Sequence, residues 1–520
     1  MAEPYVRPSD HRWTPRGSVP GPRARDSGEA LSPVRLIRAC RHIPTFRSVC
    51  GGSPVPGEFD IAIVGSGPGG YVAALKAAQG GARVAMIERE ELGGTCLNVG
   101  CIPSKALLAS AERLHELRNS AALGIRVDGE VGFDYTAVLN HKERTVRQLR
   151  AGVDALLRSN GVQIVQGQAQ FLAPDCLQIG TAQSDQVSAR NIIIATGSTE
   201  ARPPIPGLDT PGIVGSRQAL SLPAPPASLT IVGGSALGCE FASIFSHFGS
   251  KVTIVEALPR LLPVEDTDLG KGLARIFERQ GIAVKTGTRV ARFEPIEAGV
   301  RTTVSHGDRE ESLDSEMVLT AIGRVPYTEG LGLERVGVRT ERNAIVVDDA
   351  MRTTVPGIWA IGDVTGRIQL AHVASAQAEV AVSNILGESR QMDYSCVPSC
   401  VYTIPQVSSV GLSEERARLE HPGVRVGTFP FQAIGRAIAS RNTEGFVKIV
   451  ADQAWGRVLG VHILHSRASD LIAEAVLAMR LESSIEDIVA AIHPHPTFGE
   501  ALAEAALVAD NRPLHIPRRG

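Results

Sequence analysis

Two cysteines with four residues between them are the first candidates for chemistry. Cys96 and Cys101 lie between the glycine pair 93–94 and a run typical of a helix, 105–118. A helical or distorted helical turn can bring such a pair within disulfide range, because the Cα atoms need only be about 4.4–6.8 Å apart. A disulfide that closes so short a loop adds little stability. We therefore interpret the pair as redox chemistry; two buried free thiols are the alternative.

A histidine and a glutamate near the C-terminus are candidates for a base. Thr497 can cap a helix whose first turn holds Glu500, which would bring this carboxylate close to His495. A carboxylate in that place holds the imidazole in one tautomer and makes it more basic. A lone histidine is more often structural, and the sequence gives no role to His493.

A glycine-rich turn follows the apolar strand 59–64, and a helix and a second strand ending in Glu88 come after it. This order is typical of a dinucleotide-binding unit. Its glycines permit a tight turn, the approach of a pyrophosphate to a helix N-terminus, and close packing of helix on strand. The acid can accept hydrogen bonds from ribose hydroxyls. The three glycines are Gly65, Gly67 and Gly70.

The same unit recurs later in the chain at a constant spacing. Two dinucleotide sites side by side imply electron transfer between them. Ser235 replaces the middle glycine of the second unit, a change that could weaken binding modestly. Glu256 would repel the 2′-phosphate of NADP, and Arg260 follows only after three uncharged residues, so we expect NAD at this site. The repeated positions are Gly233, Gly238 and Glu256, which match Gly65, Gly70 and Glu88.

The segment 93–105, GGTCLNVGCIPSK, resembles the redox-active site of the class I pyridine nucleotide–disulfide oxidoreductases, and the resemblance extends from about residue 59 to about residue 507. It implies an α/β fold class with two Rossmann-like dinucleotide-binding domains plus a C-terminal α+β dimerisation domain. Alternating apolar runs after about residue 393 are typical of an antiparallel sheet, which agrees with the expected α+β dimerisation domain. The expected parts are a disordered leader, 1–57; the FAD-binding domain (first part), 58–206; an NAD-binding domain, 207–336; the FAD-binding and central domain (second part), 337–390; and the interface domain, 391–520.

The resemblance also implies the catalytic roles. Cys96 would face the substrate and Cys101 the flavin, while His495 of a second subunit would act as the base and Glu500 would orient it. The reaction expected is the oxidation of protein-bound dihydrolipoamide to lipoamide by a homodimer that uses FAD and passes electrons to NAD+. The partner would be a lipoyl-carrier protein or the acyltransferase core of a 2-oxo acid dehydrogenase complex. The alternatives are a related NAD(P)H-dependent reductase of another small disulfide and a non-catalytic flavin-binding subunit that docks a carrier.

Further cofactor positions follow from the resemblance. Lys105 is expected near the flavin, with Glu240 as its partner, and Asp363 suits the ribityl hydroxyls of FAD. Two residues, Tyr327 and Ile434, depart from the family's usual pattern, which often has asparagine at both places. The remaining expected FAD and NAD positions are Gly167, Thr196, Gly197, Ser198, Val290, Gly323, Gln369, Leu370, Ala371 and His372.

Composition and charge narrow the class of protein. Of the 520 residues, 43% are hydrophobic and 21% are charged, as in globular proteins. The net charge of −2 does not indicate binding to nucleic acid or to a membrane surface. No apolar run reaches the roughly 18 residues of a membrane helix, and nothing predicts a metal site. The eight cysteines are scattered, which suits a reducing compartment. We expect the cytoplasm, or the mitochondrial matrix if 1–57 is a transit peptide.

Overall fold

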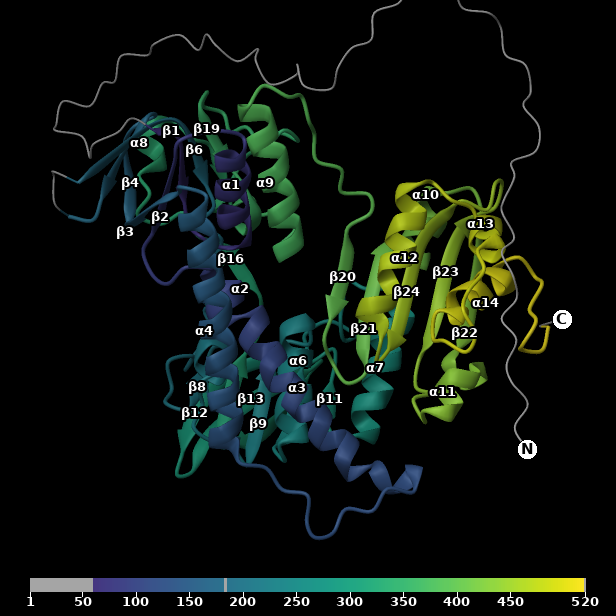
Figure 1. Ribbon diagram of the computed structural model, residues 1–520. Coiled ribbons are helices and arrows are strands. Elements are labelled where there is room, and N and C mark those ends of the chain that lie inside the picture. The colour runs from purple at the N-terminus through teal and green to yellow at the C-terminus, as the bar shows by residue number, and fades with distance from the viewer. Residues whose placement is uncertain (1–58, 182–184, 519–520) are drawn as a thin grey trace, which may run out of the picture. The chain divides into compact units, whose positions relative to one another are not determined.

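A computed structural model describes residues 59–181 and 185–518 of the chain (Figure 1). The expected leader, 1–57, lies outside the described residues. Within the described ranges, three sheets of five or more strands organise the chain. No helix of these ranges has both the length and the apolar character that crossing a membrane requires. They also contain no group of three or more His, Cys, Asp or Glu side chains that could hold a metal ion.

The first sheet is parallel at its centre, where its strands are apolar on both faces, as in sheets that helices cover. β1 (Phe59–Val64) pairs in parallel with β2 (Val84–Glu88) on one side and with β6 (Gln186–Ile194) on the other. β19 (Ile358–Ala360) pairs in parallel with β6. A strand that follows the second nucleotide unit in sequence therefore completes the sheet that contains the first unit.

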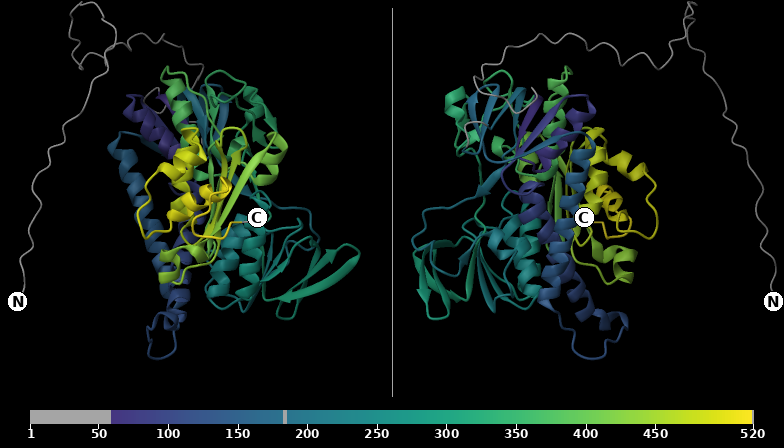
Figure 2. Two further views of the ribbon diagram at one scale, coloured as in Figure 1. Left: turned by 90° about the vertical axis from the view of Figure 1, so that its right-hand side faces the viewer. Right: turned by 60° about the vertical axis from the view of Figure 1, so that its left-hand side comes forward.

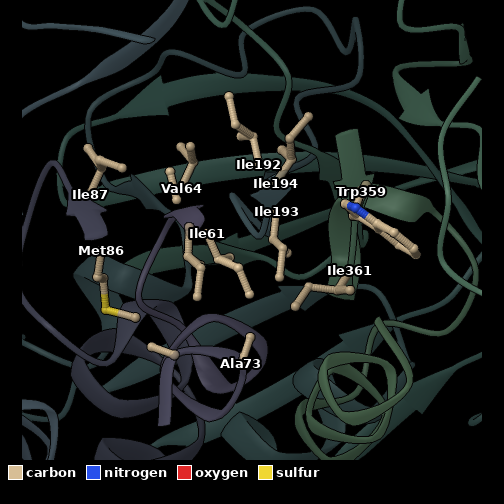
Figure 3. Packing of buried hydrophobic residues seen from close by; sticks show 14 of the residues in the cluster. Ile61, Val64, Ala73, Met86, Ile87, Ile192, Ile193, Ile194, Trp359 and Ile361 are labelled. Carbon is tan, nitrogen blue, oxygen red and sulfur yellow. The ribbon is translucent and has the colours of Figure 1, made fainter. Parts of the chain in front are cut away.

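The core of this sheet is aliphatic. α1 (Pro68–Gln79) packs against β1 and β2, and α9 (Ala371–Ile385) lies beside α1 (Figure 1). Ile61, Ile193 and Ile361 are fully buried there (Figure 3), and burial of such a side chain contributes about 1.5–3 kcal/mol. This packing fixes the strand ends from which the glycine turns emerge. The other strands of the sheet are β3 (Gln163–Gln166), β4 (Ala169–Ala173) and β5 (Cys176–Ile179).

The second sheet repeats the unit that the sequence predicts. β9 (Ser228–Val232) pairs in parallel with β10 (Lys251–Val255), and α6 (Ala236–His247) connects them, as α1 connects β1 and β2. The register of the two strands is the same in both copies. The other parallel strands are β8 (Ile213–Val214), β11 (Ala283–Lys285) and β15 (Met317–Thr320), and an antiparallel sheet beside them contains β12 (Arg289–Ile296), β13 (Gly299–His306) and β14 (Arg309–Ser315).

Two long helices pack side by side (Figure 2). α3 (Cys101–Arg118) packs against both α4 (Tyr135–Ser159) and α6, so it connects the two copies of the unit. The shorter elements of these parts are α2 (Gly94–Val99), α5 (Ser216–Ala219), α7 (Thr267–Arg279), α8 (Leu333–Val336), η1 (Ser120–Leu123), η2 (Gly362–Thr365), β7 (Ser198–Glu200), β16 (Arg324–Pro326), β17 (Thr340–Glu341) and β18 (Ala344–Ile345).

The third sheet is antiparallel, as the alternating apolar pattern predicts. The last helix, α14, spans Glu500–Ala509, so its first turn holds Glu500 as the sequence predicts. With this sheet, the predicted fold class is confirmed. The strands in spatial order are β20 (Pro398–Val401), β21 (Gln406–Gly411), β24 (Val458–His465), β23 (Phe446–Asp452) and β22 (Val424–Pro430). The other helices are α10 (Glu414–Glu420), η3 (Phe431–Ala433), α11 (Gly435–Ala439), α12 (Ala468–Arg480) and α13 (Ile485–Ala490).

The last and the middle positions of the second glycine turn differ in how strictly they require a glycine. A Cβ on Gly238 would lie 1.9 Å from the carbonyl oxygen of Gly233, so this position must stay small. The middle position is different, because a Cβ on Gly67 of the first unit would meet nothing within 4 Å. Ser235 has the same extended backbone as Gly67, with φ of −80° against −61°. The fold therefore tolerates a serine there.

We expect the substitution Gly238→Ala to lower the melting temperature in the absence of added NAD. Overpacking of this kind costs about 1–3 kcal/mol, whereas Ser235→Ala removes a hydroxyl from a half-buried turn and should change stability by less than about 0.5 kcal/mol. Differential scanning calorimetry of the two variants and the parent protein measures the difference. Equal melting temperatures for all three proteins would contradict the close contact.

Candidate active site

One cavity of about 1200 Å³ collects most of the predicted cofactor positions. It is lined by the first glycine turn, both redox cysteines and the segments that follow β6 and β19. A second cavity of about 1540 Å³ lies beside the second glycine turn, and Ser235, Val264 and Arg324 line both cavities. The predicted site residues in the first cavity are Gly65, Gly67, Glu88, Cys96, Cys101, Lys105, Gly167, Thr196, Gly197, Ser198, Glu240, Gly323, Asp363, Gln369, Leu370, Ala371 and His372.

Seven predicted site residues lie outside the lining of this cavity. The last glycine of each turn is buried against the carbonyl of the first glycine of that turn, and Val290 belongs to β12, beside a small apolar cluster with Phe293. The histidine and glutamate of the predicted base are on the third sheet's side of the molecule. These seven are Gly70, Gly233, Gly238, Glu256, Val290, His495 and Glu500.

The two cysteines come from different helices. Cys96 lies in α2 and Cys101 is the first residue of α3, because the backbone of Gly100, with φ of −145° and ψ of −112°, interrupts the helical path. Both are thiols in this structure. A hydrogen bond from the Cys96 thiol, and then the ammonium of Lys105, lower the pKa of Cys101 to about 7. The same pairing, together with burial, raises the pKa of Cys96. The Cys96 thiol and the Lys105 ammonium therefore both favour the thiolate form of Cys101.

The expected partnership of Lys105 and Glu240 is present. The Lys105 Nζ lies 2.6 Å from the Glu240 Oε2, and this links α3 to α6 of the second unit. Glu240 is 7% exposed, so its carboxylate needs such a partner. The ammonium thus lies one helical turn beyond Cys101, on the cavity side of α3.

The acids at the ends of β2 and β10 make the same contacts in the two copies. The Glu88 Oε2 accepts hydrogen bonds from the Ser66 backbone N–H at 2.9 Å and from its hydroxyl at 2.6 Å. The Glu256 Oε2 accepts one from the Gly234 N–H at 2.6 Å. Each second oxygen accepts an N–H two residues further along, at 2.8 Å in the first copy and 2.7 Å in the second. Each carboxylate is therefore buried and fixed on its own glycine turn.

Polar contacts connect the three segments that follow β6, β15 and β19 in the sequence. The Ser198 hydroxyl donates to the Asp363 Oδ2 at 2.6 Å. The Arg324 Nε donates to the Ser198 Oγ at 2.7 Å, and its Nη2 to the Ser198 carbonyl at 2.6 Å. The sequence gives no role to Arg324. The His372 Nε2 lies 2.9 Å from the Pro398 carbonyl oxygen, as a structural histidine would.

The predicted contact between the candidate base His495 and Glu500 is present. The His495 Nδ1 lies 2.7 Å from the Glu500 Oε1, and the ring is 77% exposed. The expectation that Thr497 caps the helix is wrong: its hydroxyl donates to the Pro494 carbonyl, and its backbone N–H donates to the Glu500 Oε2 at 2.8 Å. Burial would raise the pKa of Glu500, but the hydrogen bonds from His495 and Thr497 lower it overall. Glu500 is therefore an anion that anchors the ring by Nδ1 and leaves Nε2 free to act.

The two departures from the family pattern lie in different surroundings. Tyr327 lines the first cavity, not the second glycine turn, and the Arg89 guanidinium lies 4.2 Å from the centre of its ring. Ile434 is 4% exposed in the core of the third sheet. The first is thus a cavity residue and the second a packing residue. His493, to which the sequence gives no role, contacts Glu474 of α12 at 2.8 Å.

The chain belongs to the pyridine nucleotide–disulphide oxidoreductase family. The model of that family matches residues 59–378, and the model of the family's dimerisation domain matches residues 397–506. These two ranges contain the glycine turns, the cysteine pair and the His–Glu pair.

Among its relatives is a dihydrolipoyl dehydrogenase of Chlamydia muridarum, 43% identical over 462 residues, which are 88% of this chain and 98% of the relative. A mitochondrial dihydrolipoyl dehydrogenase of Arabidopsis thaliana is 42% identical and is covered over 92% of its length. Of the solved structures, LpdA from Mycobacterium tuberculosis is similar with a TM-score of 0.79 and 30% identity. An HOCl-induced flavoprotein disulfide reductase from Escherichia coli in complex with Cu(II) has a TM-score of 0.78 and 32% identity. In both cases 86% of this chain and 99% of the other are aligned.

We expect Cys101 to be the first sulfur that iodoacetamide alkylates in the reduced, flavin-free protein, in which the cavity is open and Cys101 is exposed. Only the thiolate reacts, so its labelling should follow a midpoint of about pH 7, and Cys96 should react only at higher pH. The variant Lys105→Met should raise the midpoint, because the ammonium that favours the thiolate is lost. Mass spectrometry of the labelled peptides across pH distinguishes the two sulfurs. Earlier labelling of Cys96 would contradict the assignment.

Proposed function

We propose that this protein is an FAD-dependent enzyme that oxidises protein-bound dihydrolipoamide to lipoamide and passes the electrons to NAD+. The observation that carries the proposal is that the Cys96–Cys101 pair lines the same cavity as the first glycine turn, next to the lysine–glutamate contact with the second unit. The relatives in the previous section, which are dihydrolipoyl dehydrogenases, support the choice of substrate.

The residues present fit an FAD in the first cavity. The open space at Gly67 leaves room for a pyrophosphate at the N-terminus of α1. Glu88 would accept hydrogen bonds from the hydroxyls of the adenosine ribose. Asp363, which accepts a hydrogen bond from Ser198, would accept hydrogen bonds from the hydroxyls of the ribityl chain. When bound, FAD supplies two-electron transfer between the cysteine pair and the nicotinamide.

The second unit fits NAD rather than NADP. Glu256 is a fixed acid beside the glycine turn, where a 2′-phosphate would be repelled. Arg260, the first cation after it, donates to the Pro263 carbonyl at 3.1 Å and so binds its own loop. Gly233, Gly238 and Val290 are the further positions that we assign to this site.

The cysteines exchange electrons with the substrate by thiol–disulfide chemistry. His495 of a second copy takes a proton from one thiol of dihydrolipoamide, since Glu500 holds the ring by its other nitrogen. The thiolate attacks Cys96 in the Cys96–Cys101 disulfide and displaces Cys101 as a thiolate, which Lys105 stabilises. The second substrate thiol then displaces Cys96 and closes the lipoamide disulfide. The enzyme is left as the dithiol, two electrons richer than before.

We infer a homodimer that serves a lipoyl-carrier protein or the acyltransferase core of a 2-oxo acid dehydrogenase complex. The match of residues 397–506 to a dimerisation domain supports the dimer, as do apolar side chains on this part of the chain such as Leu477, Leu481 and Ile492, which are more than 60% exposed. The division at residues 58, 207, 337 and 391 remains our proposal for the domains, and a reducing compartment, the cytoplasm or the mitochondrial matrix, our proposal for the location.

Two alternatives differ in the substrate or in the absence of catalysis. A related NAD(P)H-dependent reductase of another small disulfide is favoured by the likeness to the E. coli flavoprotein disulfide reductase. A flavin-binding subunit that only docks a carrier would not require the His495–Glu500 contact or a thiolate at Cys101. Glu256 argues against the NADPH-dependent form of the first alternative.

Two anaerobic assays run in parallel test the function. We expect NAD+ reduction with dihydrolipoamide and little NADPH oxidation with glutathione disulfide. The variant Cys101→Ser should keep its yellow flavin and lose dihydrolipoamide-dependent NADH formation, because the pair can no longer close a disulfide. Activity in the glutathione assay alone would overturn the choice of substrate, and normal turnover by Cys101→Ser would overturn the scheme.

The base has its own test. We expect His495→Gln to lower kcat by about 10²–10⁴-fold, the usual contribution of a positioned base. The exposed His306 of the β13 strand is a matched control, and His306→Gln should leave kcat unchanged. Steady-state rates with dihydrolipoamide at saturating NAD+ measure both variants. A similar rate for His495→Gln and the parent enzyme would remove His495 from the mechanism.

A further inference from the structure

The Lys105–Glu240 pair is held by a residue that neither nucleotide unit supplies. Tyr402 directly follows β20 of the third sheet and lines the same cavity. Its backbone N–H donates to the Glu240 Oε1 at 3.0 Å, while Lys105 contacts the other oxygen, Oε2. One residue of the third sheet thus fixes the orientation of the carboxylate.

The ring of the same tyrosine faces the ammonium. The Lys105 Nζ lies 4.5 Å from the centre of the Tyr402 ring, within the range in which an ammonium is attracted to an aromatic face. Burial, with the neighbouring Cys400 and Glu240, raises the pKa of the Tyr402 phenol, so the ring stays uncharged. The ammonium therefore has an anion on one side and an aromatic face on the other, and the Ser104 hydroxyl lies 3.4 Å from it.

We propose that Tyr402 is a positioning residue: it holds the Lys105–Glu240 pair beside the cysteines, so that the third sheet sets the reactivity of Cys101. A lysine side chain carries about 2 kcal/mol of rotamer entropy, and a single carboxylate contact fixes it poorly when the side chain is 31% exposed. The aromatic face supplies a second point of attachment. The inference rests on the proposed function of the cysteine pair.

The position of the ammonium matters because the two members of the pair act on Cys101 in opposite directions. Lys105 lowers the pKa of Cys101 and Glu240 raises it. If the ammonium moves away from the sulfur, the hydrogen bond from Cys96 still favours the thiolate, but burial and the Glu240 carboxylate are less compensated, so the pKa of Cys101 rises. The titratable groups that surround the Cys101 and Tyr402 side chains are Cys96 of α2, Lys105 of α3, Glu240 of α6, Cys400 of β20 and Asp470 of α12.

The test compares Tyr402→Leu with Tyr402→Phe, which keeps the aromatic face. The readout is the pH dependence of Cys101 alkylation by iodoacetamide in the reduced, flavin-free protein, in which Cys101 is exposed, followed by mass spectrometry. We expect Tyr402→Phe to keep the parent midpoint and Tyr402→Leu to raise it by roughly half a pH unit, about threefold in proton affinity, as the loss of a modest cation–π contact predicts. An unchanged midpoint in Tyr402→Leu overturns the proposal.

A second background separates positioning from a general structural effect. In Lys105→Met there is no ammonium for the ring to hold, so adding Tyr402→Leu should give no further shift. An equal shift in both backgrounds overturns the proposal. Should Tyr402→Leu fail to fold, Tyr402→Met provides an apolar side chain of greater flexibility for the same comparison. Because this assay contains neither dihydrolipoamide nor NAD+, its outcome is independent of which dithiol is the substrate.

Discussion

The contact between Lys105 and Glu240 is the interaction on which the arrangement of the site depends. It joins α3, which begins with a redox cysteine, to α6, which begins at the second glycine turn. A buried carboxylate without a partner would be costly, so the two nucleotide units cannot separate here without exposing a charge or leaving it unpaired. The same contact places a positive charge within reach of Cys101. Structure and reactivity therefore depend on one ion pair.

The duplication explains why the two sites are alike in detail and yet differ in one position. Both acids are fixed by an N–H of the glycine turn and by an N–H two residues beyond the acid. These hydrogen bonds stabilise the fold as well as position the acids for a ligand, because each one satisfies an oxygen of a buried carboxylate. The middle position of the turn makes no such contact, and so Ser235 can replace a glycine.

Much of this site could be predicted from short-range patterns. The cysteine spacing, the repeated glycine turns and the proximity of His495 to Glu500 are local features, and local sequence carries them. The details that escaped prediction depend on which segments meet in space. Arg324 and Tyr402 contact residues more than one hundred positions away, and no spacing in the sequence signals such a meeting.

The error at Thr497 has a different origin. A threonine three residues before a glutamate is a typical capping pattern, but the preceding prolines leave the Pro494 carbonyl as the partner of the hydroxyl. The glutamate side chain reaches back to the Thr497 N–H, as the pattern predicts, and only the threonine half is missing. Half of the capping motif therefore forms, and the helix begins at Glu500.

The return of β19 to the first sheet has a consequence for biosynthesis. β6 ends at Ile194, but the strand that pairs with it on its far side comes only at residues 358–360. Ribosomes add about 5–20 residues per second, and domains usually fold in the order in which they emerge. Here residues 195–357, which include the whole second sheet, must leave the ribosome before the first sheet can gain its last strand. The N-terminal nucleotide unit is therefore completed after the unit that follows it, with an open strand edge during that interval.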